Sequence, residues 1–179
     1  MIVLKSAPRP AVFLDRDGVL NIDKGYVYRK EDFSWVPGAK EILKLLNQLG
    51  FLIIVVTNQS GVARGLYKET DVIELHEWMN QDLKKDQAWI DGFYYCPHHP
   101  EAAIEFYRCQ CDCRKPAPGL IFKAMNEWAV NSFDSFLVGD RPSDIQAADR
   151  AGIKSFLYNP EKDNLYDFMI KILKERERL

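Results

Sequence analysis

Asp15 and Asp17 lie two residues apart in the tetrapeptide Asp-Arg-Asp-Gly, directly after a short apolar segment. A carboxylate at the tip of a strand can attack phosphorus and form an acyl phosphate. A second carboxylate two residues further on can protonate the leaving oxygen and then activate a water molecule for the second step. The pair therefore predicts phosphate ester hydrolysis with Asp15 as the nucleophile and Asp17 as the general acid and base.

Further polar residues follow the next apolar segments along the chain. Thr57 and Asn58 come directly after the second segment, and Asp140 follows the fourth. Two carboxylates and a phosphate repel one another in a single pocket, so the site requires a divalent cation. Asp15, Asp140 and a backbone carbonyl offer the oxygen ligands that Mg²⁺ prefers. Lys115 and Thr57 are predicted to hold the transferring phosphoryl oxygens.

Each of these motifs has a simpler interpretation when it is taken alone. Asp-x-Asp is common in solvated loops, and Thr57-Asn58 could be a turn that ends a strand. The segment 140–144 could be a helix N-terminus with acidic residues in its first turn. Their order and their positions at strand ends favour one catalytic crevice, because ligands of open parallel sheets bind at the carboxyl ends of the strands.

The elements that must position these residues alternate along the chain. Five apolar segments are predicted to be buried strands: 11–14, 51–56, 92–95, 135–138 and 154–158. Five further segments have helical periodicity: 39–49, 70–84, 118–128, 143–151 and 165–173. Ser143 and Gln146 form a capping-box pattern at the start of the fourth helix. The alternation predicts an α/β fold, a single domain over 1–179 whose mainly parallel sheet is covered by helices on both faces.

Charge and hydropathy limit the partners and the compartment. The net charge of −2 over 179 residues gives no reason to expect nucleic acid or an acidic membrane as a partner. The longest apolar run, 51–56, is too short to cross a bilayer, and residues 1–10 contain no apolar stretch of signal-peptide length. We therefore expect a cytoplasmic protein with a small-molecule substrate.

Three of the four cysteines crowd into 109–113, within a segment that contains four prolines and lacks periodicity. In a reducing compartment this crowding suggests metal binding more than disulfides. Two ligand pairs from opposite ends of the segment would form a closed, structural zinc site. Spacing alone leaves open the choice between His98 and His99, and between Cys109 and Cys113. We interpret His76, on a helix face away from this cluster, as a packing or surface residue.

The chain resembles the haloacid dehalogenase-like phosphatases in four ordered motifs: Asp15-x-Asp17-Gly18, Thr57-Asn58, Lys115 and Gly139-Asp140-x-x-x-Asp144. The resemblance implies a Rossmann-like sheet with the nucleophile strand central. It implies Mg²⁺ held by Asp15, the backbone oxygen of Asp17 and Asp140, with Asp144 as a supporting acid. Since no large insertion separates the motifs, we expect a capless enzyme, covered only by loops and monomeric.

Cys96-x-His98 followed by Cys111-x-Cys113-Arg114-Lys115-Pro116 resembles the zinc loop of a subgroup that contains heptose bisphosphate and histidinol phosphatases. This resemblance assigns the zinc, in a loop at about 96–116, to Cys96, His98, Cys111 and Cys113, and leaves Cys109 as an extra thiol. Segments 21–27 and 57–65 and the long zinc loop favour D-glycero-D-manno-heptose 1,7-bisphosphate 7-phosphatases, which serve ADP- or GDP-heptose biosynthesis for lipopolysaccharide or surface layers. Segment 139–144, the tail after Phe156 and a short C-terminal region keep histidinol-phosphate phosphatase as the alternative.

The same resemblance assigns substrate contacts to eight residues: Asp23, Gly25, Tyr26, Asn58, Gln59, Ser60, Arg114 and Arg141. The two arginines suit a second phosphate, because the planar guanidinium binds oxyanions at two points. A zinc-stabilised binding module without catalysis would lack one of the four catalytic or magnesium residues, yet all are present. A phosphomutase would need a larger lid than this sequence provides.

Overall fold

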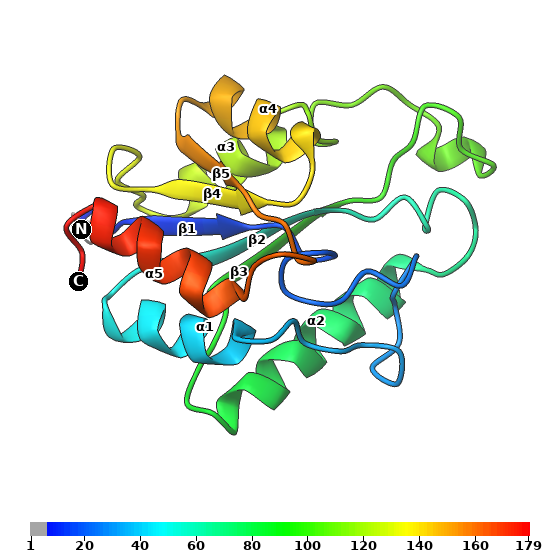
Figure 1. Ribbon diagram of the computed structural model, residues 1–179. Helices are drawn as coiled ribbons and strands as arrows, with labels where there is room; N and C mark the ends of the chain where they lie inside the picture. Colours follow the sequence, from blue (N-terminus) through cyan, green and yellow to red (C-terminus); the bar gives the residue numbers. More distant parts are fainter. Residues whose placement is uncertain (1–6) are drawn as a thin grey trace, which may run out of the picture.

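The computed structural model describes residues 7–179 and contains one five-stranded parallel sheet (Figure 1). Its strands are β1 (Ala11–Leu14), β2 (Leu52–Asn58), β3 (Gly92–Cys96), β4 (Phe136–Gly139) and β5 (Lys154–Leu157). The spatial order is β3-β2-β1-β4-β5, with every neighbouring pair parallel. The order reverses at the central strand β1, so the crevice at its carboxyl end is the expected ligand site.

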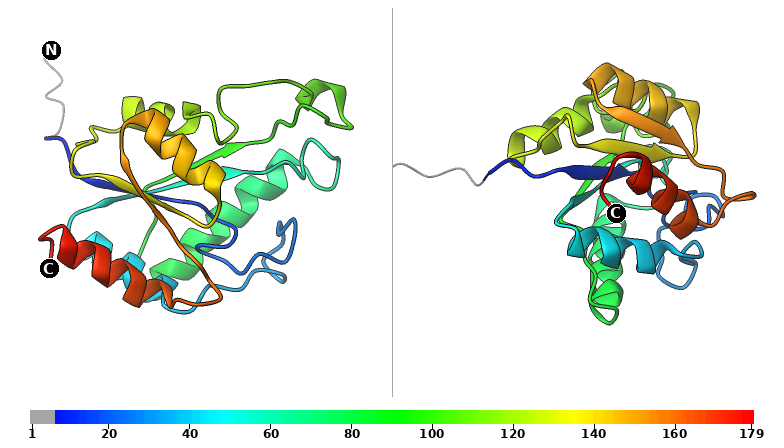
Figure 2. Two further views of the ribbon diagram at one scale, coloured as in Figure 1. Left: turned by 45° about the horizontal axis from the view of Figure 1, so that its top comes forward. Right: turned by 60° about the vertical axis from the view of Figure 1, so that its left-hand side comes forward.

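Helices cover both faces of the sheet, as predicted, and form three layers with it (Figures 1 and 2). They are α1 (Ala39–Gln48), α2 (Glu69–Lys84), α3 (Gly119–Glu127), α4 (Pro142–Ala151) and α5 (Leu165–Glu175). Alternate β1 residues face opposite layers. Val12 and Leu14 belong to the apolar cluster with α1, α2 and α5, whereas Ala11 and Phe13 pack with α3 and α4. Burial on both faces explains why β1, β2 and β4 are apolar runs. The prediction of five buried strands is wrong for the two edges: β3 is only partly buried, and in β5 Lys154 and Leu157 are exposed.

Two further differences from the sequence prediction lie at the end of β2 and at the start of α4, next to the predicted site. Strand β2 continues through Thr57 and Asn58, because Asn58 still pairs with Cys96 of β3. Helix α4 begins at Pro142, and the predicted capping box of Ser143 with Gln146 is wrong. Instead, the backbone N–H of Arg141 donates to Asp144 Oδ2 at 3.0 Å. The carboxylate three residues into the helix therefore satisfies the N-terminal donor.

Residues 97–118 form a long excursion beyond the carboxyl end of β3, prominent at the right of Figure 1. It contains one short 3₁₀ helix, η1 (Glu105–Tyr107). The backbone N–H of Ile104 donates to Ala63 O at 3.1 Å, and the Tyr107 hydroxyl donates to Glu69 Oε1 at 2.9 Å. These contacts fix the excursion against the segment that follows β2 and against α2.

No helix within residues 7–179 is both long and apolar enough to span a bilayer. The expectation that residues 1–10 contain no signal-like stretch rests in part on residues 1–6, which lie outside the described residues.

Candidate active site

Asp15 is the first residue after β1, and its backbone N–H donates to Val138 O of β4 at 3.1 Å. Its Oδ1 accepts the backbone N–H of Arg16 at 2.7 Å and lies 3.0 Å from Lys115 Nζ. Burial raises the pKa of Asp15 to about 7; Lys115 opposes this effect, and the carboxylates of Asp144 and Asp17 add to it. A cation at this carboxylate would favour its ionised form.

Lys115 is the buried cation of the crevice, with a side chain 2% exposed. Its Nζ lies 2.6 Å from Asp144 Oδ1 and donates to Val56 O at 2.8 Å, in addition to its contact with Asp15. Burial acts to lower the pKa of Lys115, but the two carboxylates outweigh it and raise the pKa. The side chain of Asn58 holds the Lys115 backbone from both sides, at 3.1 Å to its carbonyl and 3.0 Å from its N–H. Lys115 is therefore charged and fixed beside Asp15.

Carboxylate oxygens of Asp15, Asp140 and Asp144 lie within 4.8 Å of one another. Asp140 Oδ1 is buried and has no hydrogen-bond partner within residues 7–179. Burial, and then Asp144, raise the pKa of Asp140. An unpartnered buried oxygen among carboxylates fits a hard cation such as Mg²⁺. Asp144 already bonds to Lys115 and to the Arg141 backbone, so it serves to orient its neighbours.

The backbone also approaches the carboxylates of Asp140 and Asp144 closely. A Cβ on Gly18, which has φ +87°, would clash with the carboxylate of Asp140, and a Cβ on Gly139 would clash with Asp144. These two glycines of the predicted motifs are thus explained by steric contact with the carboxylates.

Three donors hold the carboxylate of Asp17. Arg16 Nη2 donates to both oxygens, at 3.1 and 2.9 Å, and Asn21 Nδ2 donates to Oδ1 at 3.0 Å. Gln59 Nε2 donates to Oδ2 at 2.9 Å and lies at the same distance from Thr57 Oγ1. The side-chain amide of Gln59 thus connects Asp17, the proposed acid, with Thr57, which is proposed to hold a phosphoryl oxygen.

A cavity of about 600 Å³ opens above these groups. Its lining includes the four predicted catalytic residues, Asp15, Asp17, Thr57 and Lys115. It also includes the eight predicted substrate contacts: Asp23, Gly25, Tyr26, Asn58, Gln59, Ser60, Arg114 and Arg141. The structure therefore brings the predicted residues to one place, at the carboxyl end of β1.

Two arginines lie at different parts of this cavity. Arg141 Nη2 pairs with Asp23 Oδ2 at 2.9 Å, and the Arg141 side chain is 61% exposed. Asp23 Oδ1 in turn accepts the backbone N–H of Gly25 at 2.9 Å. Arg114 Nη1 donates to His98 O at 3.3 Å, which ties it to the cysteine-rich loop. Both arginine residues line the cavity.

Sequence reasoning missed several residues of the site. Tyr67 and Ser143 line the cavity, and Arg16 and Asn21 contact Asp17. The signal available for Arg16 was its position between the two aspartates. Asn21 lies in the segment quoted for the resemblance but received no role.

The four cysteine-loop residues selected by resemblance come together: Cys96, His98, Cys111 and Cys113. Their sulfur atoms lie 3.1 to 3.6 Å apart, and His98 Nδ1 lies 3.4 Å from Cys113 Sγ. Zn–S bonds of about 2.3 Å would place tetrahedral sulfur ligands roughly 3.8 Å apart, so modest expansion would accommodate the ion. Cys109 is exposed and outside this cluster. The cluster could hold zinc next to Arg114 and Lys115.

His76 is buried on α2, in agreement with its interpretation as a packing residue. Its ring stacks on Phe93 with centroids 4.4 Å apart, and its Nε2 lies 3.4 Å from Arg16 Nη1. Burial and the Arg16 cation hold the pKa of His76 well below its usual value. His76 is thus a neutral residue in the layer beneath the crevice.

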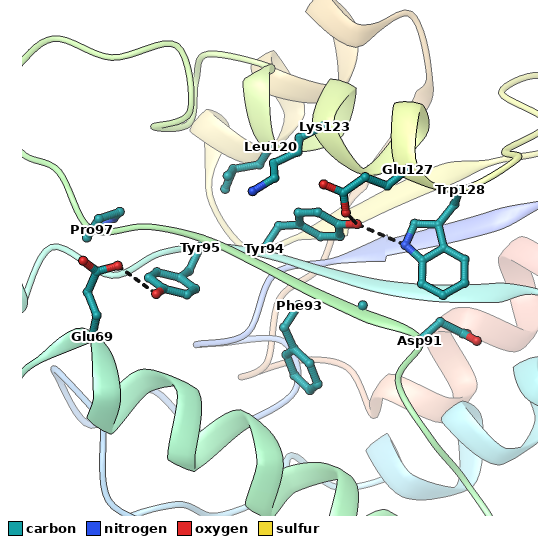
Figure 3. A pocket seen from close by; sticks show the side chains of 11 residues that line it. Glu69, Asp91, Phe93, Tyr94, Tyr95, Pro97, Leu120, Lys123, Glu127 and Trp128 are labelled. Atoms are coloured by element: carbon teal, nitrogen blue, oxygen red, sulfur yellow. Dashed lines mark hydrogen bonds between the residues drawn. The ribbon is translucent and has the colours of Figure 1, made fainter.

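A separate hollow of about 620 Å³ runs along the edge strand β3, between α2 and α3 (Figure 3). The Tyr94 hydroxyl donates to Glu127 Oε2 at 2.6 Å and accepts from Trp128 Nε1 at 3.0 Å. The Tyr95 hydroxyl donates to Glu69 Oε2 at 2.8 Å. These polar groups bond to one another, and the predicted site residues lie elsewhere.

Comparison with known proteins agrees with this arrangement. A family model described as HAD-hydrolase-like matches residues 112–166. The chain is 44% identical over 174 residues to the D-glycero-beta-D-manno-heptose-1,7-bisphosphate 7-phosphatase of Rhodopseudomonas palustris, covering 97% of this chain and 96% of the relative. It is 40% identical over 171 residues to the protein of that name from Escherichia coli K12, covering 92% and 90%.

Among solved structures, the D,D-heptose 1,7-bisphosphate phosphatase of B. bronchiseptica, complexed with magnesium and phosphate, superposes with a TM-score of 0.80. The two sequences are 29% identical, and the match covers 93% of this chain and 99% of the other.

Proposed function

The chain belongs to the haloacid dehalogenase-like phosphatases, in the family of the heptose-1,7-bisphosphate 7-phosphatases, and we propose that it hydrolyses the C7 phosphate of D-glycero-beta-D-manno-heptose 1,7-bisphosphate. It is a phosphoric monoester hydrolase. The observation that carries the proposal is the convergence of the Asp15–Lys115 pair, the Asp17 carboxylate and two arginines in one cavity. The names of these relatives favour the β anomer, and they favour heptose over histidinol phosphate.

The proposed reaction has two steps on Asp15. In the first, a carboxylate oxygen of Asp15 bonds to phosphorus while the bond from phosphorus to the sugar O7 breaks, and Asp17 gives its proton to O7. In the second, Asp17 takes a proton from water as the water oxygen bonds to phosphorus. The bond between phosphorus and Asp15 then breaks, which releases inorganic phosphate and restores the carboxylate.

The phosphoryl group is held by charge and hydrogen bonding throughout. Lys115 and Thr57 would contact its oxygens, and the ion pair with Asp144 keeps Lys115 in place. Asp15, Asp140 and the backbone oxygen of Asp17 would hold Mg²⁺, which supplies positive charge against the phosphoryl oxygens when it is bound. Zinc in the cysteine cluster would serve to fix the loop that carries Arg114 and Lys115.

We propose that Arg114 and Arg141 bind the phosphate that stays on the sugar, and that Asp23, Gly25, Tyr26 and Ser60 contact the sugar itself. Arg141 pairs with Asp23 at the mouth of the cavity, so the pair can be rearranged by an incoming anion. The amide of Asn58 is committed to the Lys115 backbone and contributes by fixing that residue. We also propose that the enzyme is a cytoplasmic monomer with a single domain and that its partner is a small sugar phosphate.

The experiment follows the phosphorus atoms of heptose 1,7-bisphosphate by ³¹P NMR. We expect loss of the C7 signal and accumulation of the 1-phosphate, and no turnover by Asp15→Asn, which removes the nucleophile but keeps its volume. Asp86→Asn, whose carboxylate pairs with Lys40 outside the cavity, is the matched control and should retain activity. Loss of the C1 phosphate first, or activity in Asp15→Asn, would contradict the proposal.

A further inference from the structure

The side-chain amide of Gln59 directs both of its N–H groups and its oxygen to groups inside the protein. A primary amide can donate two hydrogen bonds and accept two. Gln59 Nε2 donates to Asp17 Oδ2 and to Thr57 Oγ1, both at 2.9 Å. Its Oε1 accepts the Tyr67 hydroxyl at 2.7 Å and Arg16 Nη2 at 3.1 Å. The side chain is buried, with the residue 1% exposed.

The chemistry of the neighbours fixes the orientation of this amide. A guanidinium only donates, so the Gln59 atom facing Arg16 must be the carbonyl oxygen. The nitrogen must then face Asp17 and Thr57, where carboxylate and hydroxyl oxygens accept. A flip of the amide would place a donor against a donor on one side and an acceptor against a carboxylate on the other. Gln59 is therefore locked in the orientation that donates to Asp17.

Arg16 supports the same carboxylate from beneath the cavity. Its side chain is fully buried, and the two N–H groups of Nη2 are shared among Asp17, the Gln59 amide oxygen and Val27 O, of which Val27 O is nearest at 2.6 Å. The imidazole Nε2 of His76, held neutral, faces Nη1. A buried guanidinium is costly unless it is paired, and its ion-pair partner within residues 7–179 is Asp17. Such a cation under the crevice indicates a requirement for fixing Asp17 in place.

We propose that Gln59 and Arg16 are positioning residues that hold the carboxylate of Asp17 in line with the leaving oxygen. Gln59 also joins Asp17 to Thr57, so one amide aligns the group that moves the proton with the group that holds the phosphoryl oxygen. This role replaces the direct sugar contact expected for Gln59. The inference rests on the proposed hydrolysis, in which the Asp17 proton passes to the alcohol oxygen as the bond between that oxygen and phosphorus breaks.

Substrates whose leaving groups differ in basicity show whether Gln59 positions the acid Asp17 or only supports the structure of the site. An alkoxide leaving group, as in the sugar phosphate or glycerol phosphate, needs the proton from Asp17. The p-nitrophenolate leaving group departs without one. Since kcat/KM reports the steps up to phosphoryl transfer to Asp15, the ratio of kcat/KM for the two classes measures how well the proton is delivered.

For Gln59→Met, we expect kcat/KM for the alkyl phosphate to fall about 10- to 100-fold, since small misplacement of a catalytic group has effects of this size. The fall for p-nitrophenyl phosphate should stay within roughly threefold. Tyr67→Phe, which removes only the hydroxyl that donates to Gln59 Oε1, should show the same pattern more weakly and serves if Gln59→Met does not fold. Gln81→Met makes the same chemical change at an exposed position of α2 and is the control.

Equal losses for both substrate classes in Gln59→Met and Tyr67→Phe would overturn the inference, because they indicate a damaged site. A raised KM for the sugar bisphosphate with kcat unchanged would overturn it in favour of a direct sugar contact. The wild-type protein separates the two proposals. Its failure on heptose bisphosphate would refute the substrate, whereas glycerol phosphate and p-nitrophenyl phosphate still test the positioning of Asp17.

Discussion

Replacing Lys115 by methionine tests the electrostatic centre of the site. The Lys115 Nζ lies 3.0 Å from Asp15 and 2.6 Å from Asp144, and its side chain is 2% exposed. Removing one member of a buried ion pair leaves the other charges without compensation, which costs about 3–5 kcal/mol. At pH 8 the variant leaves Asp144 without its ion-pair partner, and the pKa of Asp15, about 7 with Lys115 present, rises further without it. We therefore expect destabilisation by roughly 4 kcal/mol in EDTA at that pH.

Urea unfolding followed by tryptophan fluorescence measures this loss. With a urea m-value of about 2 kcal/mol/M, the midpoint should fall by roughly 2 M. In the double variant Lys115→Met/Asp144→Asn, removal of one carboxylate should recover about 1–3 kcal/mol, because contacting residues are coupled. Lys40→Met is the matched control. Lys40 pairs with Asp82 and Asp86 but is 28% exposed, so its loss should cost less than about 1 kcal/mol.

A loss below about 1 kcal/mol for Lys115→Met, or strict additivity with Asp144→Asn, would refute a strong interaction between these charges. Either result would mean that the charges are solvated and that the site has no buried electrostatic centre. Activity is a separate readout, and we expect it to fall about 10²- to 10³-fold, as for loss of one donor to a transition-state oxyanion.

The stabilisation by Mg²⁺, measured as a shift in Tm, should be larger at pH 8 than at pH 5.5. The pKa of Asp15 in the folded protein, about 7, lies above its usual value, so the metal-free protein loses stability as the pH rises through 7. Above that pH, bound Mg²⁺ compensates the charge of the Asp15 carboxylate in place of the proton. Equal shifts at both pH values would contradict this. In Asp15→Asn the pH dependence should weaken, because only the raised pKa of Asp140 remains among the proposed ligands. Cys111→Ala should lose zinc, measured by elemental analysis, and should lower activity because the loop no longer fixes Lys115. Cys109→Ala, at an exposed position, should keep both zinc and activity. Zinc lost from Cys109→Ala and kept in Cys111→Ala would refute the ligand assignment. Arg141→Met should raise KM for the bisphosphate far more than for a monophosphate, and equal effects would exclude a contact with the second phosphate.

The three inner strands of the sheet were predictable because they are buried on both faces. Continuous apolar runs such as 11–14 report that burial directly. The end of β2 was less predictable, since Asn58 belongs to the strand only through its pairing with Cys96, far along the chain. The start of α4 was mispredicted for a similar reason. Asp144 acts both at the helix N-terminus and as a partner of Lys115, which periodicity does not indicate.

The predicted residues line one cavity, but the hydrogen bonds that connect them were not predicted. Their positions after strands placed Asp15, Thr57 and Asp140 in one crevice, because strand ends converge, whereas Lys115 depended on the resemblance. The buried network beneath them was not predicted, since hydropathy gives no sign that Arg16 turns inward or that Gln59 uses its whole amide internally. The choice among zinc ligands likewise depended on resemblance, because spacing does not tell which side chains the loop brings together.

The central claim is tested most directly by steady-state phosphate release from the α and β anomers of heptose 1,7-bisphosphate and from histidinol phosphate, each with Mg²⁺ and with EDTA. We predict the highest kcat/KM for the β anomer, by orders of magnitude over histidinol phosphate, and loss of activity in EDTA. Preference for histidinol phosphate, or full activity without a divalent cation, would contradict it.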